Sequence, residues 1–186
     1  MTERRSQATP VRTPRGRAAG RSLRRGAFGL VVLASVWAAT LPGTAADAPA
    51  PLAPPLSLPD LDGRTRTLQE FLGARPVLLE FMSTDCPHCR YMGPVLARLH
   101  AVYGDRVNFL TVAFDRDARR VRAFAQREKH SWPYLMGTQE VIDAYHLEGV
   151  PIFCLVAPDG RVLDVRVGST SYESMRQSLE TLLAAR

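Results

Sequence analysis

The sequence is poor in cysteine, has no internal repeat and contains no hydrophobic run long enough to cross a membrane as an ordinary helix. Its 186 residues include three cysteines, so no second cysteine pair is available to complete a zinc site beside Cys86 and Cys89. The main apolar stretch, residues 27–41, is 15 residues long, whereas a spanning helix needs about 20. The absence of repeats and heptads excludes solenoids and coiled coils.

A net positive charge is also missing from the part of the chain that follows residue 26. Residues 1–26 hold eight arginines and one glutamate, a net charge of +7. The whole chain carries a formal charge of +6, which leaves −1 for all the remaining residues. A nucleic-acid-binding domain needs a basic face on its folded body, so we expect no nucleic-acid partner.

Residues 1–46 have the pattern of an export signal. The arginine-rich start is followed by the apolar stretch 27–41 and then by Pro42, Gly43 and small residues that suit a signal peptidase. The pattern predicts an exported, periplasmic protein, either soluble after cleavage or held by an uncleaved membrane anchor. It does not decide between the general and the twin-arginine export routes. Residues 47–55 are rich in alanine and proline, and we expect an extended linker without helix or sheet.

From residue 56 to 186 short apolar runs alternate with amphipathic segments, which predicts one domain. The expected strands lie at 56–58, 64–67, 76–82, 107–114, 152–157 and 161–167. The expected helices lie at 68–72, 87–103, 117–129, 139–145 and 172–185. Asp62-Gly63 and Pro158-Asp159-Gly160 are turn signals for two hairpins. This order predicts an α/β fold whose central mixed sheet is covered by helices on both faces.

Two of the cysteines form the sequence Cys86-Pro87-His88-Cys89, directly after an expected strand and at the start of an expected helix. Unpaired N–H groups and the positive dipole end of a helix N-terminus stabilise a thiolate, which is the reactive form of cysteine. Pro87 suits the first helical turn. We therefore expect Cys86 to be the exposed nucleophile, Cys89 to be the buried resolving thiol, and a protonated His88 to stabilise the thiolate.

The sequence alone does not exclude a structural role for the cysteines. A Cys-x-x-Cys pair can be half of a zinc site, for which Cys154 and His100 are loose candidates that both lie in apolar segments. A purely structural disulfide is also possible, although so short a loop stabilises weakly. Cys154 is expected to behave as a small buried hydrophobe. We expect structural or surface roles for His100 and His146, and packing of Trp132.

The segment from residue 76 to 168 resembles the thioredoxin superfamily. Its shared features are the strand–Cys-x-x-Cys–helix unit, Pro94 inside the following helix, Gly149-Val150-Pro151 before an apolar strand, and Asp159-Gly160 before a strand that ends at Val167-Gly168. Residues 58–63 and 68–71 and the extra segment 116–138 are similar to the TlpA/ResA branch of exported thioredoxin-like proteins. That branch carries an N-terminal β-hairpin extension and a central insertion.

The resemblance implies roles for three further residues. In this family the proline at the position of Pro151 is cis and lies against the cysteine pair, and the residue at the position of Val150 offers backbone groups to an extended substrate. Glu80 occupies the place of a buried acid that relays a proton for the second cysteine, for which a raised pKa is suitable. A solvated acid at the strand end is the alternative for Glu80.

Several residues depart from the family pattern. Asp85 stands where tryptophan is usual, and an acid there opposes formation of a thiolate at Cys86. Thr111 falls where thioredoxins often have a lysine near the buried acid. The pair Pro87-His88 resembles the strongly oxidising DsbA-type proteins rather than the reductants of the TlpA/ResA branch. This pair predicts a potential more oxidising than that of thioredoxin.

The function expected from these features is dithiol–disulfide exchange by an enzyme that needs no cofactor and no metal. Its expected partners are exported protein thiols and disulfides, for instance apocytochrome c or copper-site proteins, together with a membrane electron donor or acceptor. The direction of electron flow stays open. A copper-handling chaperone on the same scaffold is the alternative, although its cysteine spacing is typically wider. Leu79 and Ser83 interrupt the peroxiredoxin pattern, which disfavours peroxidase activity.

Overall fold

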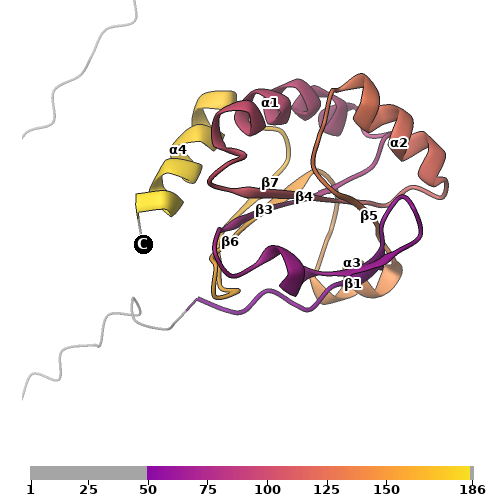
Figure 1. The fold of residues 1–186 in the computed structure, drawn as a ribbon. Coiled ribbons are helices and arrows are strands. Elements are labelled where there is room, and N and C mark those ends of the chain that lie inside the picture. Colours follow the sequence, from indigo (N-terminus) through magenta and orange to yellow (C-terminus); the bar gives the residue numbers. More distant parts are fainter. Residues whose placement is uncertain (1–49, 185–186) are drawn as a thin grey trace, which may run out of the picture. The chain divides into compact units, whose positions relative to one another are not determined.

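A five-stranded mixed sheet forms the centre of the computed structural model, which describes residues 50–184 (Figure 1). The export signal or anchor expected at residues 1–46 lies outside the described residues. The strands follow the spatial order β5-β4-β3-β6-β7. Their bounds are Val77–Met82 for β3, Asn108–Ala113 for β4, Tyr134–Met136 for β5, Ile152–Val156 for β6 and Val162–Val167 for β7. Strands β3, β4 and β5 run parallel to one another, whereas β6 is antiparallel to both β3 and β7.

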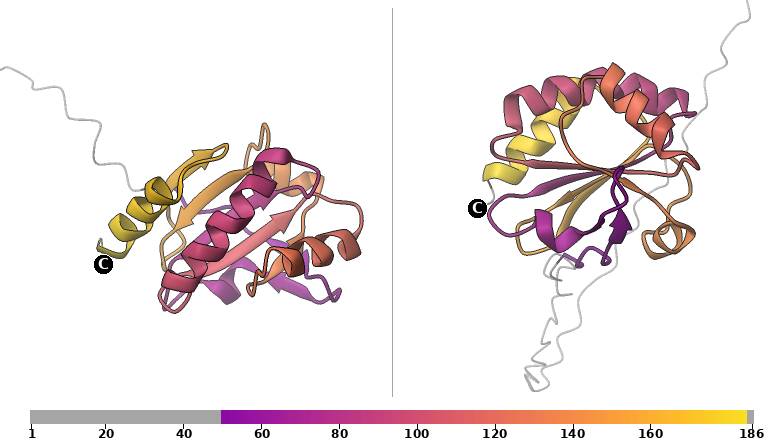
Figure 2. Two further views of the ribbon diagram at one scale, coloured as in Figure 1. Left: turned by 90° about the horizontal axis from the view of Figure 1, so that it is seen from above. Right: turned by 45° about the vertical axis from the view of Figure 1, so that its right-hand side comes forward.

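Helices cover both faces of this sheet, as the sequence predicted. Helices α1 (Pro87–Tyr103), α2 (Ala118–Arg127) and α4 (Tyr172–Ala184) lie on one face, and the shorter helix α3 (Gln139–Ala144) lies on the other (Figures 1 and 2). Within the described residues no helix combines the length and the apolar character needed to span a bilayer.

Alternation along the strands divides the core into two clusters, one on each face of the sheet. On β3, Leu78 and Met82 belong to the cluster beneath α1, whereas Val77, Leu79 and Phe81 belong to the opposite cluster. Successive side chains of a strand point to opposite faces, so Glu80 shares the α1 face with Leu78 and Met82. This alternation decides which polar residues of neighbouring strands meet.

An N-terminal hairpin packs on the same face of the sheet as α3 (Figure 1). It consists of β1 (Ser57–Pro59) and β2 (Thr65–Thr67), followed by the short 3-10 helix η1 (Leu68–Phe71). Gly63 closes the turn with a φ of 82°, a conformation that glycine adopts without steric cost. The β-hairpin expected from Asp62-Gly63 is therefore confirmed.

The expectation that the linker contains no sheet is wrong at one residue. Leu52 forms an isolated antiparallel bridge with Arg161 at the start of β7. The Val162 amide donates to the Pro51 carbonyl at 2.8 Å, and the Ala53 amide donates to the Gly160 carbonyl at 2.8 Å. The edge of β7 supplies these partners, which composition alone did not reveal.

The strand β5 was missed in the sequence, because its three residues are fewer than the four to eight from which periodicity is usually recognised. Residues 116–138, expected to be an insertion, supply α2 and this edge strand. Helix α1 spans the expected residues 87–103. The other helix and strand ends differ from expectation by one or two residues, which is ordinary for fraying ends.

Candidate active site

The first turn of α1 holds the cysteine pair. Cys86 is the N-cap residue with extended backbone, and Pro87 occupies the first helical position. The backbone N–H of Cys89 donates to Sγ of Cys86 at 3.3 Å. This N–H has no partner within the helix because it lies in the first turn, so it is available to a thiolate at Cys86.

The two sulfurs differ in their access to solvent. Cys86 is partly exposed, whereas Cys89 is fully buried on the side of α1 that faces the sheet. Burial raises the pKa of Cys89 well above the ordinary thiol value, and its hydrogen bond with Cys86 raises it further. The structure therefore places an accessible thiol at the helix tip and a buried thiol one turn behind it, as expected.

The loop before β6 brings Val150 and Pro151 against the helix tip. The Cys86 thiol donates to the Val150 carbonyl with an Sγ–O distance of 3.4 Å. The Val150–Pro151 peptide is cis, as the resemblance implied. The Pro151 carbonyl accepts the N–H of Gly168 at 2.8 Å, which ties this loop to the end of β7. The fold thus joins residues that lie 64 positions apart.

Glu80 lies on the same face of the sheet as Cys89 and is 3% exposed, so it is not a solvated acid at the end of the strand. Burial raises the pKa of its carboxyl to about 7, and a hydrogen bond from the Thr111 hydroxyl opposes this rise. That bond joins Thr111 Oγ1 to Glu80 Oε2 at 2.8 Å. The charge of Glu80 is also one of the causes that raise the pKa of Cys89. The two groups therefore interact electrostatically.

Asp85 has a partner that the sequence did not reveal. Its carboxylate forms an ion pair with Arg120 of α2, so the negative charge next to Cys86 is partly compensated. The preceding Thr84 donates its backbone N–H to Asp115 at 2.9 Å, and its hydroxyl donates to the same carboxylate. These contacts fix the loop between β3 and α1 to the segment after β4.

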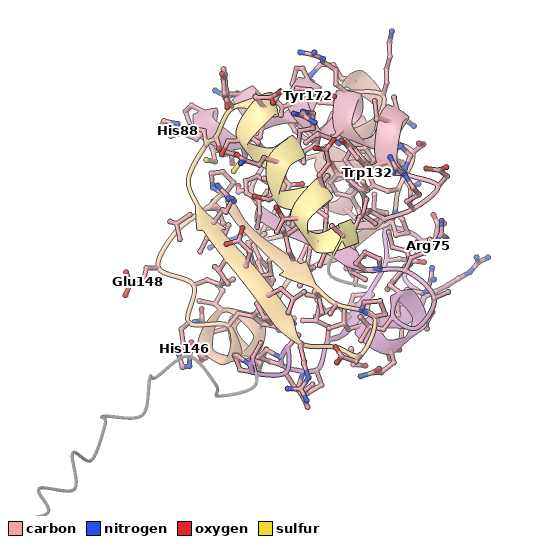
Figure 3. All side chains as sticks on the ribbon, turned by 90° about the vertical axis from the view of Figure 1, so that its left-hand side faces the viewer. Arg75, His88, Trp132, His146, Glu148 and Tyr172 are labelled. Atoms are coloured by element: carbon pink, nitrogen blue, oxygen red, sulfur yellow. The ribbon has the colours of Figure 1, made fainter. Side chains whose placement is uncertain are left out.

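A shallow cleft beside Cys86 carries His88 on its rim. It is lined by Pro87, His88, Tyr91 and residues 169–171. His88 projects from the surface (Figure 3), and its Nδ1 lies 3.3 Å from the Ser169 hydroxyl. Tyr91 is 61% exposed. The cleft therefore offers an aromatic ring and hydroxyl groups next to the accessible thiol.

The remaining candidate residues do not join this site. Cys154 belongs to the cluster on the opposite face of the sheet, and burial raises the pKa of its thiol to about 11. His100 packs against the rings of Phe109 and Trp132, which belong to the α1-side cluster. Cys154 and His100 are therefore separated by the sheet. His146 lies elsewhere on the surface, well away from His88 in Figure 3.

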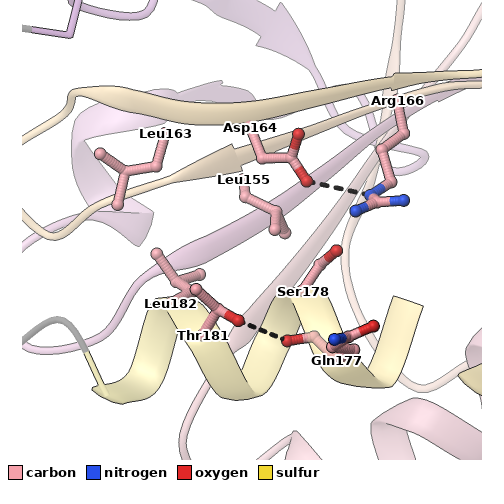
Figure 4. Close-up of a pocket in the computed structure, with 8 residues that line it drawn as sticks. All are labelled: Leu155, Leu163, Asp164, Arg166, Gln177, Ser178, Thr181 and Leu182. Atoms are coloured by element: carbon pink, nitrogen blue, oxygen red, sulfur yellow. Dashed lines mark hydrogen bonds and ion pairs between the residues drawn. The ribbon is translucent and has the colours of Figure 1, made fainter. Parts of the chain in front are cut away.

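A second pocket lies between the edge of the sheet and α4 (Figure 4). Its walls are Leu155, Leu163, Asp164, Arg166, Gln177, Ser178, Thr181 and Leu182. Asp164 and Arg166 neutralise each other in an ion pair of 2.9 Å. None of the residues predicted for the site lines this pocket, so we do not assign it to thiol chemistry.

Comparison with known proteins gives consistent results for this chain. The model of the AhpC/TSA family matches residues 49–165. The chain is 30% identical over 131 residues to the thioredoxin-like protein YneN of Bacillus subtilis, covering 69% of this chain and 76% of that protein. It is 30% identical over 132 residues to the thiol-disulfide oxidoreductase ResA of Geobacillus thermodenitrificans, covering 70% of this chain and 75% of that protein.

Solved structures have the same fold. A putative thiol:disulfide interchange protein DsbE from Chlorobium tepidum superposes with a TM-score of 0.66 at 21% identity, covering 73% of this chain and 98% of that chain. The structure of MTB dsbF superposes with a TM-score of 0.61 at 25% identity, covering 68% of this chain and 94% of that chain. The mixed sheet with helices on both faces is therefore a thioredoxin-like fold.

Proposed function

Since the chain belongs to the AhpC/TSA family and resembles its ResA-like thiol–disulfide oxidoreductases, we propose that Cys86 and Cys89 exchange disulfides with protein partners. The observation that supports this proposal best is the placement of Cys86. It is the N-cap of α1, is partly exposed and lies 3.4 Å from the Val150 carbonyl beside the cis Pro151. The enzyme acts on protein thiols and disulfides and needs no organic cofactor.

The exchange proceeds through a mixed disulfide. In the reducing direction the Cys86 thiolate attacks one sulfur of a partner disulfide, forms a Cys86–partner disulfide and releases the other partner sulfur as a thiolate. The Cys89 thiolate then attacks Sγ of Cys86. The second partner sulfur leaves, and a Cys86–Cys89 disulfide remains. The oxidising direction is the reverse of these steps. In either direction the two electrons pass from the dithiol to the disulfide that is reduced, opposite to the transfer of the disulfide.

Glu80 supplies the base for the second step. Cys89 is buried as a thiol with a raised pKa, so it must lose a proton before it attacks. A carboxyl whose pKa lies at about 7 is present in both protonation states near neutral pH, which suits a group that accepts and returns a proton. Glu80 accepts the proton of Cys89 and releases it after the partner has left.

The partners are exported proteins, in line with the signal pattern of residues 1–46. Apocytochrome c and the cysteines of copper sites are candidate substrates, with a membrane protein as electron donor or acceptor. The copper-handling alternative would require a ligand set, and within residues 50–184 no group of three or more His, Cys, Asp or Glu side chains is placed to hold a metal ion. Metal analysis of the reduced protein distinguishes the alternatives, since a stoichiometric copper that blocks exchange would favour the chaperone.

The variant Cys89→Ala tests the proposal directly. Without the resolving thiol, the Cys86–partner disulfide cannot be released, so this variant should accumulate mixed disulfides with its partners in the exported compartment. Non-reducing electrophoresis and mass spectrometry would identify them. The double variant Cys86→Ala/Cys89→Ala is the matched control and should trap none. If Cys89→Ala traps no more protein than the control, the exchange mechanism fails.

The redox potential gives a separate prediction. Pro87-His88 places an imidazole on the rim of the cleft beside Cys86, and a protonated imidazole stabilises a thiolate and hence the reduced enzyme. We expect a potential more oxidising than the roughly −270 mV of thioredoxin. Equilibration with glutathione buffers measures it, and His88→Ala should lower it. A value at or below that of thioredoxin would contradict the prediction.

A further inference from the structure

Glu80 is the end of a chain of buried hydrogen bonds that joins three elements of the fold. The Thr111 hydroxyl on β4 lies 2.8 Å from Glu80 Oε2. The indole N–H of Trp132, which comes just before β5, lies 2.9 Å from the same Thr111 hydroxyl oxygen. Thr111 is fully buried and Trp132 is 8% exposed. Solvent therefore does not compete for these bonds.

The chemistry of the three groups fixes the direction of the chain. An indole N–H can only donate, and a hydroxyl has a single proton to donate. The Thr111 oxygen accepts from Trp132, and the Thr111 hydroxyl donates its own proton to the Glu80 carboxyl. The Tyr134 hydroxyl, which also interacts with Thr111, lies against His130 Nδ1. A hydrogen bond donated to a carboxylate stabilises the ionised form.

No positive charge performs this task. Burial raises the pKa of Glu80 and the hydrogen bond from Thr111 opposes this rise, and among the described residues no lysine or arginine is a cause of the shift. The titratable groups that interact with Glu80 are Cys89 on α1 and Tyr134 on β5. Opposite Glu80, strand β6 presents Phe153. Stabilisation of the ionised form of Glu80 therefore depends on the hydrogen bond from the Thr111 hydroxyl.

Trp132 is itself held in place by His130. His130 stacks on its ring with a centroid distance of 4.0 Å. His130 Nε2 lies 2.9 Å from the Gly93 carbonyl, so it must carry the proton, and its Nδ1 then accepts from the Tyr134 hydroxyl at 2.5 Å. Gly93 belongs to α1. The ring that directs Thr111 is thereby fixed relative to the helix that carries the cysteines.

We propose that Thr111 and Trp132 are positioning residues, which hold one hydroxyl proton on the Glu80 carboxylate and so keep it available as the proton acceptor of Cys89. They take the place of a cationic partner for the buried acid. The inference deepens the function proposed above and rests on the role of Glu80 in it. Both side chains are buried, and their hydrogen bonds lead to Glu80 rather than to the cysteines, so we expect their effect to pass through Glu80.

The test is an NMR titration of the Glu80 carboxyl carbon in the reduced full chain, with the signal assigned by its loss in Glu80→Gln. Thr111→Val removes the donor, and the pKa of Glu80 should rise by about one unit or more. Trp132→Phe keeps an aromatic ring but frees the hydroxyl to rotate, and a smaller rise of about half a unit should follow. Thr111→Ser retains the hydroxyl and is the matched control, with the wild-type value expected.

A second measurement separates this inference from the proposed function. Cys86 is loaded with a chromogenic aromatic thiol as a mixed disulfide, and its release by Cys89 is followed as a function of pH. The midpoint of the profile should move upward in the same variants. If the pKa of Glu80 shifts but the midpoint of the pH profile does not, Thr111 and Trp132 do position the carboxylate, but Glu80 is not the proton acceptor of Cys89. If Thr111→Val leaves the Glu80 titration unchanged, the inference is overturned whatever the activity. An unchanged titration in Trp132→Phe alone overturns the part assigned to Trp132.

Discussion

At the scale of single residues, Glu80 is a buried acid, and burial makes ionisation of its carboxyl unfavourable. It is the one buried acidic side chain among residues 50–184. Its pKa is raised from 4.5 to about 7 in the folded chain. Because the unfolded chain keeps the ordinary value, the folded and unfolded states bind protons differently between these two pH values. The stability of the fold must therefore depend on pH in that window.

The sign of this dependence follows from proton linkage. Below pH 4.5 Glu80 is protonated in both states and has no effect, whereas between 4.5 and 7 the unfolded chain ionises first and gains stability. The folded state thus loses roughly 3 kcal/mol as the pH rises through about 7. In Glu80→Gln this loss should be absent, so the variant should be more stable than the wild type at pH 8 and nearly equal to it at the acid end of the window.

Urea unfolding of the reduced proteins at pH 5 and pH 8 measures this difference. The matched control is Glu173→Gln on the surface of α4, which should follow the wild type at both pH values apart from a small effect of its exposed ion pair with Arg176. A wild type whose free energy of unfolding does not fall relative to Glu80→Gln between pH 5 and pH 8 would contradict the raised pKa of Glu80.

At the scale of elements, the start of α2 depends on a single side chain. Asp117 is its N-cap residue, and its carboxylate accepts the backbone N–H of Arg119 at 2.9 Å. Such a cap satisfies one of the donors left open at a helix start. The helix also carries Arg120, the partner of Asp85 beside the cysteine pair. A well-formed α2 therefore supports the loop that precedes Cys86.

Loss of this cap should be measurable. We expect Asp117→Ala to lower the free energy of unfolding by about 1 kcal/mol. Asparagine caps helices about as well as aspartate, so Asp117→Asn should keep most of the stability. Urea midpoints of the two variants compare them directly. Equal losses in both variants would point to the charge of Asp117, rather than its cap, as the source of stability.

At the scale of the whole molecule, the segment before the hairpin is part of the folded body. Pro51 bonds β7 and Ala53 bonds Gly160 in the turn before it. The Tyr145 hydroxyl also donates to the Pro54 carbonyl at 2.7 Å. Tyr145 also packs its ring against Phe81 of β3, with a centroid distance of 4.7 Å. Residues 50–55 therefore connect the edge strand with the core beneath the sheet.

Truncation tests this contribution. Compared with a chain that begins at residue 50, a chain that begins at residue 56 loses four hydrogen bonds and should be less stable by about 4 kcal/mol, at roughly 1 kcal/mol for each bond. Circular dichroism of the two chains would follow unfolding in urea. Equal stability of the two chains would mean that residues 50–55 are only a tether.

The sequence by itself determined the local parts of this protein. The apolar run before Cys86, the Cys-x-x-Cys spacing and Pro87 defined a strand, a helix start and a pair of thiols, because each depends on neighbours within a few residues. Gly63 and Gly160 marked their hairpins for the same reason, with φ values of 82° and 90°. The order of these units predicted a mixed sheet covered by helices on both faces, and the resemblance of residues 76–168 to the thioredoxin superfamily implied the thioredoxin-like fold.

Only the tertiary structure decided which distant residues meet. The position of Pro151 against the cysteine pair was implied by family resemblance, but the Arg120 partner of Asp85 and the bond from Trp132 to Thr111 had no signal in the sequence. The physical reason is that such contacts depend on strand register and on the packing of α2. Thr111 lies beside Glu80 because β3 and β4 pair in that register, and one residue of slip would turn its hydroxyl to the opposite face of the sheet.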